Sequence, residues 1–431
     1  MGTPDSLPRW HRRCCTDQTM RLSLRVATLL TVAHMLGVVT VQAQTSSPAP
    51  GGGPSAGWVF TPRVGMGGAW DDNVLLVNPA DRPPPDYASP ISPSISLDYI
   101  GRRTQVSSGY SGSWVLYRRL EQLNSFDQGL RLVARHRATQ RLTLFAQEEF
   151  NVAPSTDAVQ LIGVPFYRIG TRTNALTGGF ESTLSARTTV SGGYTRRSVD
   201  FDPVGFGGDE PIAFELQGGH AHEVVLTLLR SVSSRLAVGG EYAFTRAIVG
   251  GGEQGEAGIL EDRFDIQRGS VTASYRLTPT VGVTGGLGVA QLGGGLAHEA
   301  RTGPTWAVGV TRRARRTMVS ANYRRSYVPS FGFGGTFQNE EFAASLLVPF
   351  ARGRAYVDSS VSWFDNDSLT PGQPSLQTVS SSSVLGYRAT RWLSAEGYYI
   401  RTQQDAQRAG GQLRRNQIGF RMVAAKPVRL R

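Results

Sequence analysis

Residues 236–248 read LAVGGEYAFTRAI and alternate in character along most of their length. The even-numbered positions are mostly apolar, such as Leu236, Tyr242 and Phe244, whereas the odd-numbered positions are small or polar, such as Glu241 and Thr245. Successive side chains of a β-strand point to opposite faces of the sheet. The stretch therefore predicts a strand with one apolar and one polar face.

The same alternation recurs in residues 106–116, 342–348 and 418–424. Segments of about ten residues with one apolar face are the signature of outer-membrane barrels, weak for each segment and strong when repeated. Counting them predicts strands near 58–70, 93–100, 104–118, 126–137, 141–152, 172–184, 188–200, 218–231, 235–248, 262–277, 280–290, 302–312, 316–328, 338–350, 354–365, 377–389, 392–403 and 412–424. The expected fold is all-β, a single transmembrane antiparallel barrel of about 18 strands, within a range of 16–20.

The connections give a second signal. Short turns recur about 35–48 residues apart, and the strand that leaves them often opens alike, as in Arg141-Leu142 and Arg235-Leu236. Longer loops rich in Gly, Pro, Asp and Glu separate these hairpins, at 71–92, 153–168, 201–217, 249–261, 292–301 and 366–376. Outer-membrane barrels have short periplasmic turns and long extracellular loops. A soluble β-sandwich or propeller is the alternative fold.

Composition agrees with this reading. Glycine accounts for 51 of the 431 residues, charged residues for 18% and hydrophobic residues for 40%. So much glycine disfavours long helices, and so little charge disfavours disorder. The 45 Lys and Arg residues, of which only Lys426 is lysine, are scattered along the chain rather than gathered in one tail. We therefore expect no nucleic-acid partner.

The start of the chain resembles a secretory signal. Basic residues follow Met20, residues 26–41 are mostly apolar, and Val41-Gln42-Ala43 is a small-residue cleavage site. The expected organisation is a signal peptide in 1–43 whose true start is Met20, a flexible linker in 44–57 and a barrel in 58–431. An uncleaved membrane anchor is the alternative. Both cysteines, Cys14 and Cys15, precede the cut, so we expect neither disulfides nor thiolate chemistry in the exported protein.

The mature chain resembles the β-barrel porin type 2 family. The features that carry the resemblance are Trp70-Asp71-Asp72-Asn73-Val74 after the first strand, a proline-bearing loop up to Pro93, and the short-turn repeats. One departure is the basic tail to Arg431, where many outer-membrane barrels end on an aromatic residue. The even number of expected strands, with short periplasmic turns, predicts an outer-membrane location with both termini periplasmic. The resemblance implies exopolysaccharide or exosortase-linked passage of polysaccharide. The implied partners are outer-membrane lipid and lipopolysaccharide, the barrel assembly machinery and a periplasmic polysaccharide export protein.

Alternation also predicts which residues line the lumen. Charged residues of both signs fall on the polar faces, at Arg131, Arg135, Glu149, Glu181, Glu241, Arg324, Arg354, Asp358 and Arg421. Such a wall would select solutes by charge and size, or its charges would simply pair across it. Tyr117, Tyr356 and Tyr398 are the inward aromatic candidates for stacking on sugars. A second group of tyrosines falls on the apolar faces as interface residues, at Tyr110, Tyr194, Tyr242 and Tyr323.

The residues give little support for catalysis. His220 and His222 share a strand face, but Glu223 points the other way, so no metal site is expected. Asp71-Asp72-Asn73 lacks a full set of calcium ligands, and no nucleophile-elbow motif occurs. We expect no enzyme activity, no catalytic residue, no metal and no cofactor.

Three functions stay open from the sequence. The favoured one is a channel for polysaccharide export. The second is a general diffusion porin for small solutes, which an inward-folding loop would favour, with 201–217 and its Phe201, Phe206 and Phe214 as the candidate. The third is a barrel-borne lipid or sugar hydrolase, which would need a Ser and a His on adjacent strands near the outer rim.

Overall fold

The computed structural model describes residues 57–81, 83–159, 161–202, 216–250, 262–293, 300–370, 372–407 and 411–430. All of them belong to one compact unit, Pro48–Arg431. The expected signal peptide, most of the linker and both cysteines lie outside the described residues, as does His298. So do residues 203–215, which include two of the three phenylalanines of the expected inward loop.

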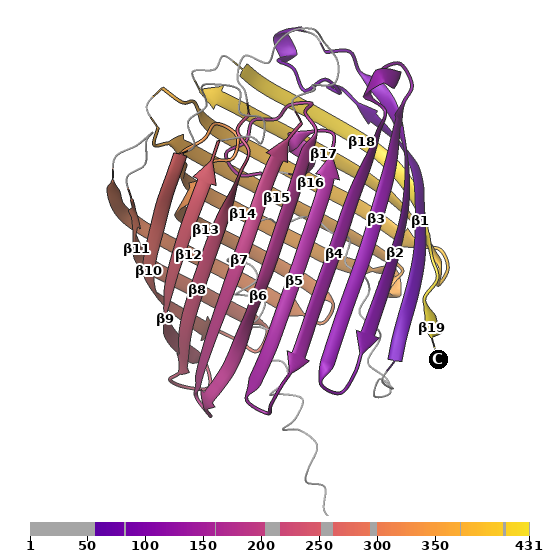
Figure 1. Cartoon of the computed structure of the whole chain (residues 1–431). Helices are drawn as coiled ribbons and strands as arrows, with labels where there is room; N and C mark the ends of the chain where they lie inside the picture. Colours follow the sequence, from indigo (N-terminus) through magenta and orange to yellow (C-terminus); the bar gives the residue numbers. More distant parts are fainter. Residues whose placement is uncertain are drawn as a thin grey trace, which may run out of the picture. The chain divides into compact units, whose positions relative to one another are not determined.

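The chain forms a closed antiparallel barrel of eighteen strands, in which each strand pairs with its neighbours in sequence and β1 also pairs with β18 (Figure 1). The predicted fold class is therefore confirmed. The barrel strands are β1 (Gly57–Asp71), β2 (Asp86–Ile100), β3 (Thr104–Tyr117), β4 (Ser125–Arg137), β5 (Leu142–Ala153), β6 (Thr171–Ser185), β7 (Thr188–Phe201), β8 (Gly219–Ser231), β9 (Leu236–Val249), β10 (Asp262–Arg276), β11 (Val281–Leu292), β12 (Arg301–Ala314), β13 (Thr317–Pro329), β14 (Thr336–Phe350), β15 (Ala355–Ser368), β16 (Ser375–Arg388), β17 (Leu393–Gln407) and β18 (Gly411–Ala425). A short additional strand, β19 (Val428–Leu430), follows β18.

In the described parts of the chain, helix is confined to single turns, namely η1 (Pro79–Asp81), η2 (Glu121–Leu123), α2 (Thr156–Val159) and η3 (Ala351–Gly353). Among the described residues, no helix has the length and apolar character to cross a membrane. The last strand, β19, extends the edge of β18, because both pair with β1, β19 at Trp58–Phe60 and β18 from Arg63 onward.

The two faces of the wall differ in chemistry. In β9, Tyr242 is 46% exposed on the outer face, whereas Glu241 lies on the inner face and accepts a hydrogen bond from Arg268 at 2.9 Å. Leu226, Val271 and Leu287 are exposed on the same outer face as Tyr242. The period of two in the sequence thus separates an apolar outer surface from a polar lumen.

The barrel has two unlike ends, which we call the turn end and the loop end. The turn end carries the short connections, and four of them are built alike. In each, a Thr or Ser hydroxyl accepts hydrogen bonds from the backbone N–H groups two and three residues later, as at Thr139, Ser233, Thr278 and Thr390. Such hydroxyl turns replace backbone bonds that a tight reversal cannot make.

The expected start of the second strand was wrong. β2 begins at Asp86 rather than near residue 93, and Pro90 lies where the pairing with β1 is interrupted between Ala88 and Ile91 without a change of register. Proline is tolerated in a sheet at such an irregularity because no ladder hydrogen bond is needed from its nitrogen. Pro90 and Pro93, which read as loop residues, are therefore part of the wall, whereas Pro83, Pro84 and Pro85 precede the strand.

Candidate functional site

The loop between β5 and β6, residues 154–170, enters the barrel at the loop end and reaches the opposite wall. The backbone N–H of Phe166 donates to Oε1 of Gln404 on β17 at 2.7 Å, and Nε2 of Gln404 donates to the carbonyl of Val164 at 3.3 Å. The Phe337 ring of β14 lies over Gly163, and the Ser330 hydroxyl donates to the Gly163 carbonyl at 3.4 Å. Since β5 and β6 lie far from β14 and β17 around the wall, these contacts span the lumen.

The loop leaves almost no space against the wall it reaches. Leu161, Ile162, Gly163 and Phe166 face residues of β15 and β16 across a cavity of about 20 Å³, lined on the wall side by Phe364, Asn366, Thr378 and Ser380. A cavity of ~10–15 Å³ holds about one water molecule. This side of the lumen is therefore closed at the level of the loop.

A buried arginine fixes the start of the loop to the seam of the barrel. Arg415 on β18 donates from Nε and Nη2 to Oδ2 of Asp71 on β1 at 2.9 and 2.6 Å, and its Nη1 donates to Oδ2 of Asp157 in the loop. The Arg415 side chain is 9% exposed, and the side chains of Asp71 and Asp157 are 2% and 13% exposed. The guanidinium and the two carboxylates each have a partner of opposite charge in this buried cluster, so the loop is tied to two strands at once.

A second arginine fixes the end of the loop. Arg168 donates from Nε to the carbonyl of Val74 at 2.7 Å and from Nη2 to the hydroxyl of Tyr117 at 2.6 Å. Its guanidinium also lies 5.4 Å from the centre of the Tyr117 ring. Within the loop, the Thr156 hydroxyl accepts from the N–H of Tyr167 at 2.8 Å, and burial raises the pKa of the Tyr167 phenol.

Other segments fill the loop end around this crossing. Phe331 of the β13–β14 connection belongs to a buried apolar cluster with inward residues of β7–β11, and Leu161 packs against that cluster. The cluster comprises Val199, Ala221, Ala247, Val249, Phe264, Ile266, Ala290, Leu292, Tyr327 and Phe331. The N–H of Gln217 donates to the carbonyl of Gly332 at 2.8 Å. We call the crossing loop and the residues packed around it the narrow zone. It is thus built on several strands rather than on one loop.

Below this zone, most of the charged residues expected in the lumen meet a partner of opposite sign. Arg135 donates to Glu181 at 3.2 Å, Arg268 to Glu241 at 2.9 Å and Arg421 to Glu396 at 2.5 Å. Arg324 is ion-paired with Glu341, and Arg131 stands opposite Glu149 in the β4–β5 register. The wall therefore carries paired charges distributed around its circumference.

Two of the expected lumen residues differ from the rest. Asp358 lies on the inner face of β15 opposite Leu347, with no arginine in register. Arg354 is exposed and precedes β15 in the connection from β14, so it lies at the turn end rather than on the wall. Arg354 directly follows η3, the three-residue helical turn that connects β14 to β15.

The inward tyrosines are engaged in the wall. Tyr117 is 7% exposed beneath Arg168, and the Tyr356 hydroxyl donates to Oε1 of Glu396 at 2.7 Å. Tyr398 packs close to Gly419, with the Arg421 guanidinium 6.0 Å from its ring centre. Among the tyrosines expected outside, Tyr110, Tyr194 and Tyr242 are 37%, 43% and 46% exposed. The fourth, Tyr323, donates its hydroxyl to Glu340 at 2.6 Å.

Other groups singled out in the sequence have structural partners. Nδ1 of His222 is hydrogen-bonded to the Tyr194 hydroxyl at 2.7 Å. Ser198 stands opposite His220 on adjacent strands, and the His220 ring lies edge-on to the His222 ring with the ring centres 5.4 Å apart. Asp72 accepts from the backbone and side chain of Asn416, both at 2.6 Å. Within the described part of the chain, no three His, Cys, Asp or Glu residues gather as a metal site.

The residues that fix the crossing loop were not predicted. The sequence carries no signal for these residues. Asp157 and Arg168 lie in an aperiodic loop, and Gln404 and Arg415 look like ordinary inward strand residues. The one available signal was Asp71, noted in the sequence as part of an acidic turn, whose partner is 344 residues away.

No protein-family model matches this chain, and no curated protein is detectably similar to it in sequence. Solved structures of similar architecture include OccAB4 of Acinetobacter baumannii, 11% identical over 87% of this chain and 99% of that one, with a TM-score of 0.42. OccK2 (OpdF) of Pseudomonas aeruginosa in complex with glucuronate is 11% identical over 87% and 98%, with a TM-score of 0.44. The siderophore receptor PirA of Pseudomonas aeruginosa is 10% identical over 85% and 80%, with a TM-score of 0.42. Likeness at this level concerns the barrel architecture alone.

Proposed function

We propose that the protein is an outer-membrane channel for small solutes, narrowed at its extracellular end by the β5–β6 loop. The observation that carries the proposal is the crossing of the lumen by residues 154–170 and their hydrogen bonds to β17. Barrels of 16–18 strands leave an aqueous channel unless something fills it. A loop that crosses the lumen sets the size of what passes.

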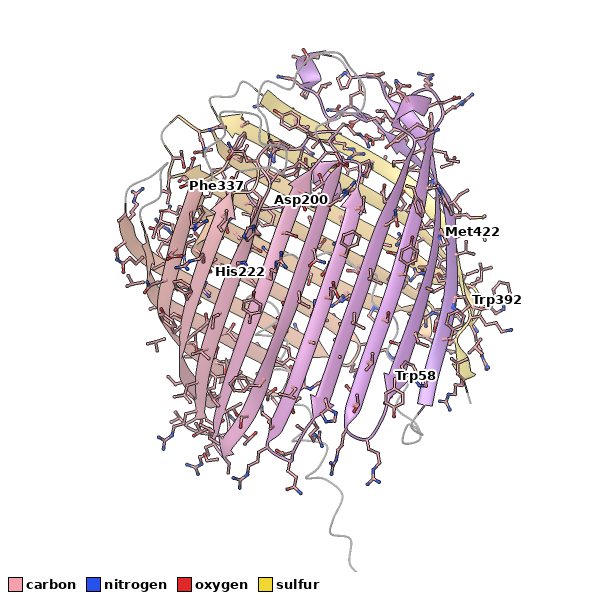
Figure 2. All side chains as sticks on the ribbon, viewed as in Figure 1. Trp58, Asp200, His222, Phe337, Trp392 and Met422 are labelled. Carbon is pink, nitrogen blue, oxygen red and sulfur yellow. The ribbon has the colours of Figure 1, made fainter. Side chains whose placement is uncertain are left out.

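The membrane location is supported by the outer surface. Leu287, Val271 and Leu385 are 71%, 63% and 57% exposed, and side chains of this kind follow the outer face of most strands. Exposed apolar side chains on this scale are unfavourable in water and favourable in a bilayer. Trp58 and Trp392, near the turn end, are the aromatic residues that would sit at the periplasmic interface (Figure 2).

Small solutes suit the geometry better than a polysaccharide does. A polymer chain in transit must keep a wide path open throughout, and here the loop is held by two buried arginines. Polysaccharide passage would require Arg415 and Arg168 to release the loop. The favoured sequence hypothesis therefore gives way to the second one, with the constriction built from 154–170. The β-barrel porin type 2 assignment and the export partner stay predictions.

The charge pattern of the lumen suggests the solute class. Glu181, Glu241 and Glu396 each have an arginine partner. Paired charges in a polar wall attract polar molecules without a strong field of one sign. We therefore expect passage of small polar solutes with modest discrimination between cations and anions.

The test is electrical and osmotic, on refolded protein whose gel mobility shifts on boiling. Small, steady steps in a planar bilayer, and liposome swelling that falls off with sugar size, are the expected results. The function would be refuted by an absence of conductance and swelling from the wild type and from a variant lacking residues 158–166. Release of fatty acid from labelled phospholipid, abolished by Ser198→Ala, would instead establish the hydrolase alternative.

A further inference from the structure

One sector of the outer surface combines an apolar groove with a row of basic side chains above it. The groove has a volume of about 630 Å³ and lies over β7–β11. Its floor is low because Gly240 and Gly269 have no side chains, and its sides are formed by apolar residues of the neighbouring strands, Val190, Leu226, Leu228, Tyr242, Val271, Leu287 and Val289. The most exposed of these, Leu287, is 71% exposed.

The basic row lies nearer the loop end on the same sector. Arg196 on β7 stands opposite His222 on β8, His222 opposite Arg246 on β9, and Arg246 opposite Asp265 on β10. Adjacent strands are ~4.8 Å apart, so three basic groups fit within ~10 Å across the wall. Arg196 is exposed and has no hydrogen-bond or ion-pair partner among the described residues.

The other two members of the row are held in place. Arg246 donates from Nε and Nη2 to the two oxygens of Asp265 at 2.8 and 2.9 Å. His222 is fixed by the Tyr194 hydroxyl, and Figure 2 shows it on the front wall, toward the loop end. Preorganised guanidinium groups bind phosphate oxygens well because their N–H donors are already oriented.

The distance between row and groove fits one amphipathic molecule. Arg246 and Tyr242 are four residues apart on β9, which corresponds to ~13 Å along the strand. The Tyr194 hydroxyl is hydrogen-bonded to His222, and the Tyr242 hydroxyl donates to Gln267. Tyrosines of this kind mark the boundary between hydrocarbon and headgroups. The row thus lies at headgroup level and the groove at acyl-chain level.

The opposite sector of the rim, over β13–β17, does not share this charge. At the corresponding level of β13–β17, Arg325 stands opposite Glu340, Glu340 opposite Asp365, and Gln377 opposite Asp405. Three carboxylates and one guanidinium make that sector acidic. An anionic lipid would therefore be drawn to β7–β9 and repelled from β14–β17.

We propose that this sector binds the phosphorylated, multiply acylated glycolipid of the outer leaflet, the lipid A part of lipopolysaccharide. Its phosphate lies on Arg196, His222 and Arg246, and one acyl chain lies in the groove over Gly240 and Gly269. The inference rests on the outer-membrane location of the proposed function, and it does not depend on the lumen being open.

The test measures how much lipopolysaccharide stays bound. Full-length mature protein is folded into vesicles containing lipopolysaccharide, extracted in mild detergent, and the lipid retained per barrel is quantified. Arg196→Gln with Arg246→Gln should lower retention at least about fivefold, since one basic group near an anionic surface contributes roughly that factor. Arg401→Gln, an exposed outer-face arginine on β17, is the matched control and should retain the wild-type amount.

A second variant tests the groove. A Cβ placed on Gly269 meets nothing within 4 Å, so Gly269→Leu fills the groove without strain in the wall. It should also lower retention, and the effect of the arginine variant should vanish with lipid A lacking its phosphates. Equal retention by all variants would overturn the proposal, as would equal losses from Arg401→Gln. A barrel that retains lipid as expected but conducts nothing would reject the channel and leave the lipid site standing.

Discussion

Replacing Asp157 by Asn should loosen the β5–β6 loop and enlarge the channel. Among the described residues, the carboxylate of Asp157 makes the hydrogen bond and ion pair between the loop and Arg415, and both side chains are largely buried. Arg415 keeps Asp71 in the variant, so the loss is that of one charged hydrogen bond, about 1.5–3 kcal/mol. If only the closed loop position makes this contact, the ratio of closed to open positions falls by about 10- to 150-fold.

The assay is single-channel recording of folded protein, with conductance histograms and open times. We expect the Asp157→Asn variant to visit a larger conductance level that the wild type seldom reaches. Asp265→Asn is the matched control, because it makes the same substitution in an Arg–Asp pair that is exposed on the outer face, away from the loop. That control should behave as wild type.

A second substitution reaches the same loop by a route that involves no charge. Gly163 has φ +71°, and a Cβ there would lie 2.5 Å from the Phe337 ring. Gly163→Ala should therefore weaken the closed position by at least about 1 kcal/mol, roughly fivefold in population. Conductance histograms identical to wild type in both Asp157→Asn and Gly163→Ala would refute the assignment of this loop as the constriction.

Three further outcomes are expected. Replacing Arg131, Arg135 and Arg324 together with Gln removes the arginine that faces each of Glu149, Glu181 and Glu341. The reversal potential under a salt gradient should therefore shift toward cation selectivity. Arg354→Gln alone should leave the reversal potential unchanged. An unshifted potential in the triple variant would contradict the inward position of these residues. Glu396→Gln removes a carboxylate, 4% exposed, that accepts from Arg421 and Tyr356, and should lower the free energy of unfolding by about 2–4 kcal/mol. Urea titration measures this, with Glu340→Gln at the more exposed outer face as the control that should lose less than about 1 kcal/mol. Removal of residues 426–431 deletes β19, which is exposed and pairs with only three residues of β1. The truncated chain should therefore still fold and shift its gel mobility on boiling. Failure to do so would show that the tail is needed for barrel closure.

The wall was predictable because its information is local. Alternation over ten residues determines which side chains face outward, and the Thr or Ser turns repeat a recognisable pattern, as at Ser233 and Thr390. Hence the strand count and the two faces of β9 follow from the sequence. The start of β2 did not, because Pro90 interrupts the alternation in the sequence, whereas the strand keeps one register with β1 on both sides of the interruption.

The narrow zone was not predictable for the opposite reason. Asp157 and Arg415 are 258 residues apart, and nothing near either of them in sequence marks them as a pair. Inward strand positions are polar whether they line the lumen or hold a loop, so Gln404 and Arg415 look alike before the fold is known. The paired state of Arg135 and Glu181 likewise depends on the registers of β4, β5 and β6.

The pairing of β1 with β18 has a consequence for how the barrel is built. Every other neighbouring pair of full-length strands is consecutive in sequence and can zip as a hairpin, at a small entropic cost for each short connection. Only this seam, with Val64 opposite Ala424, joins strands from the two ends of the described chain. The seventeen consecutive strand pairs could therefore form in either direction along the chain, and the barrel would close only when β1 pairs with β18. Because Trp58 stands opposite Leu430, a short peptide could join the ends of the wall and a new opening could be cut at any short turn. Such circular permutants would place the seam elsewhere, and their folding rates would tell whether closure or hairpin growth limits assembly.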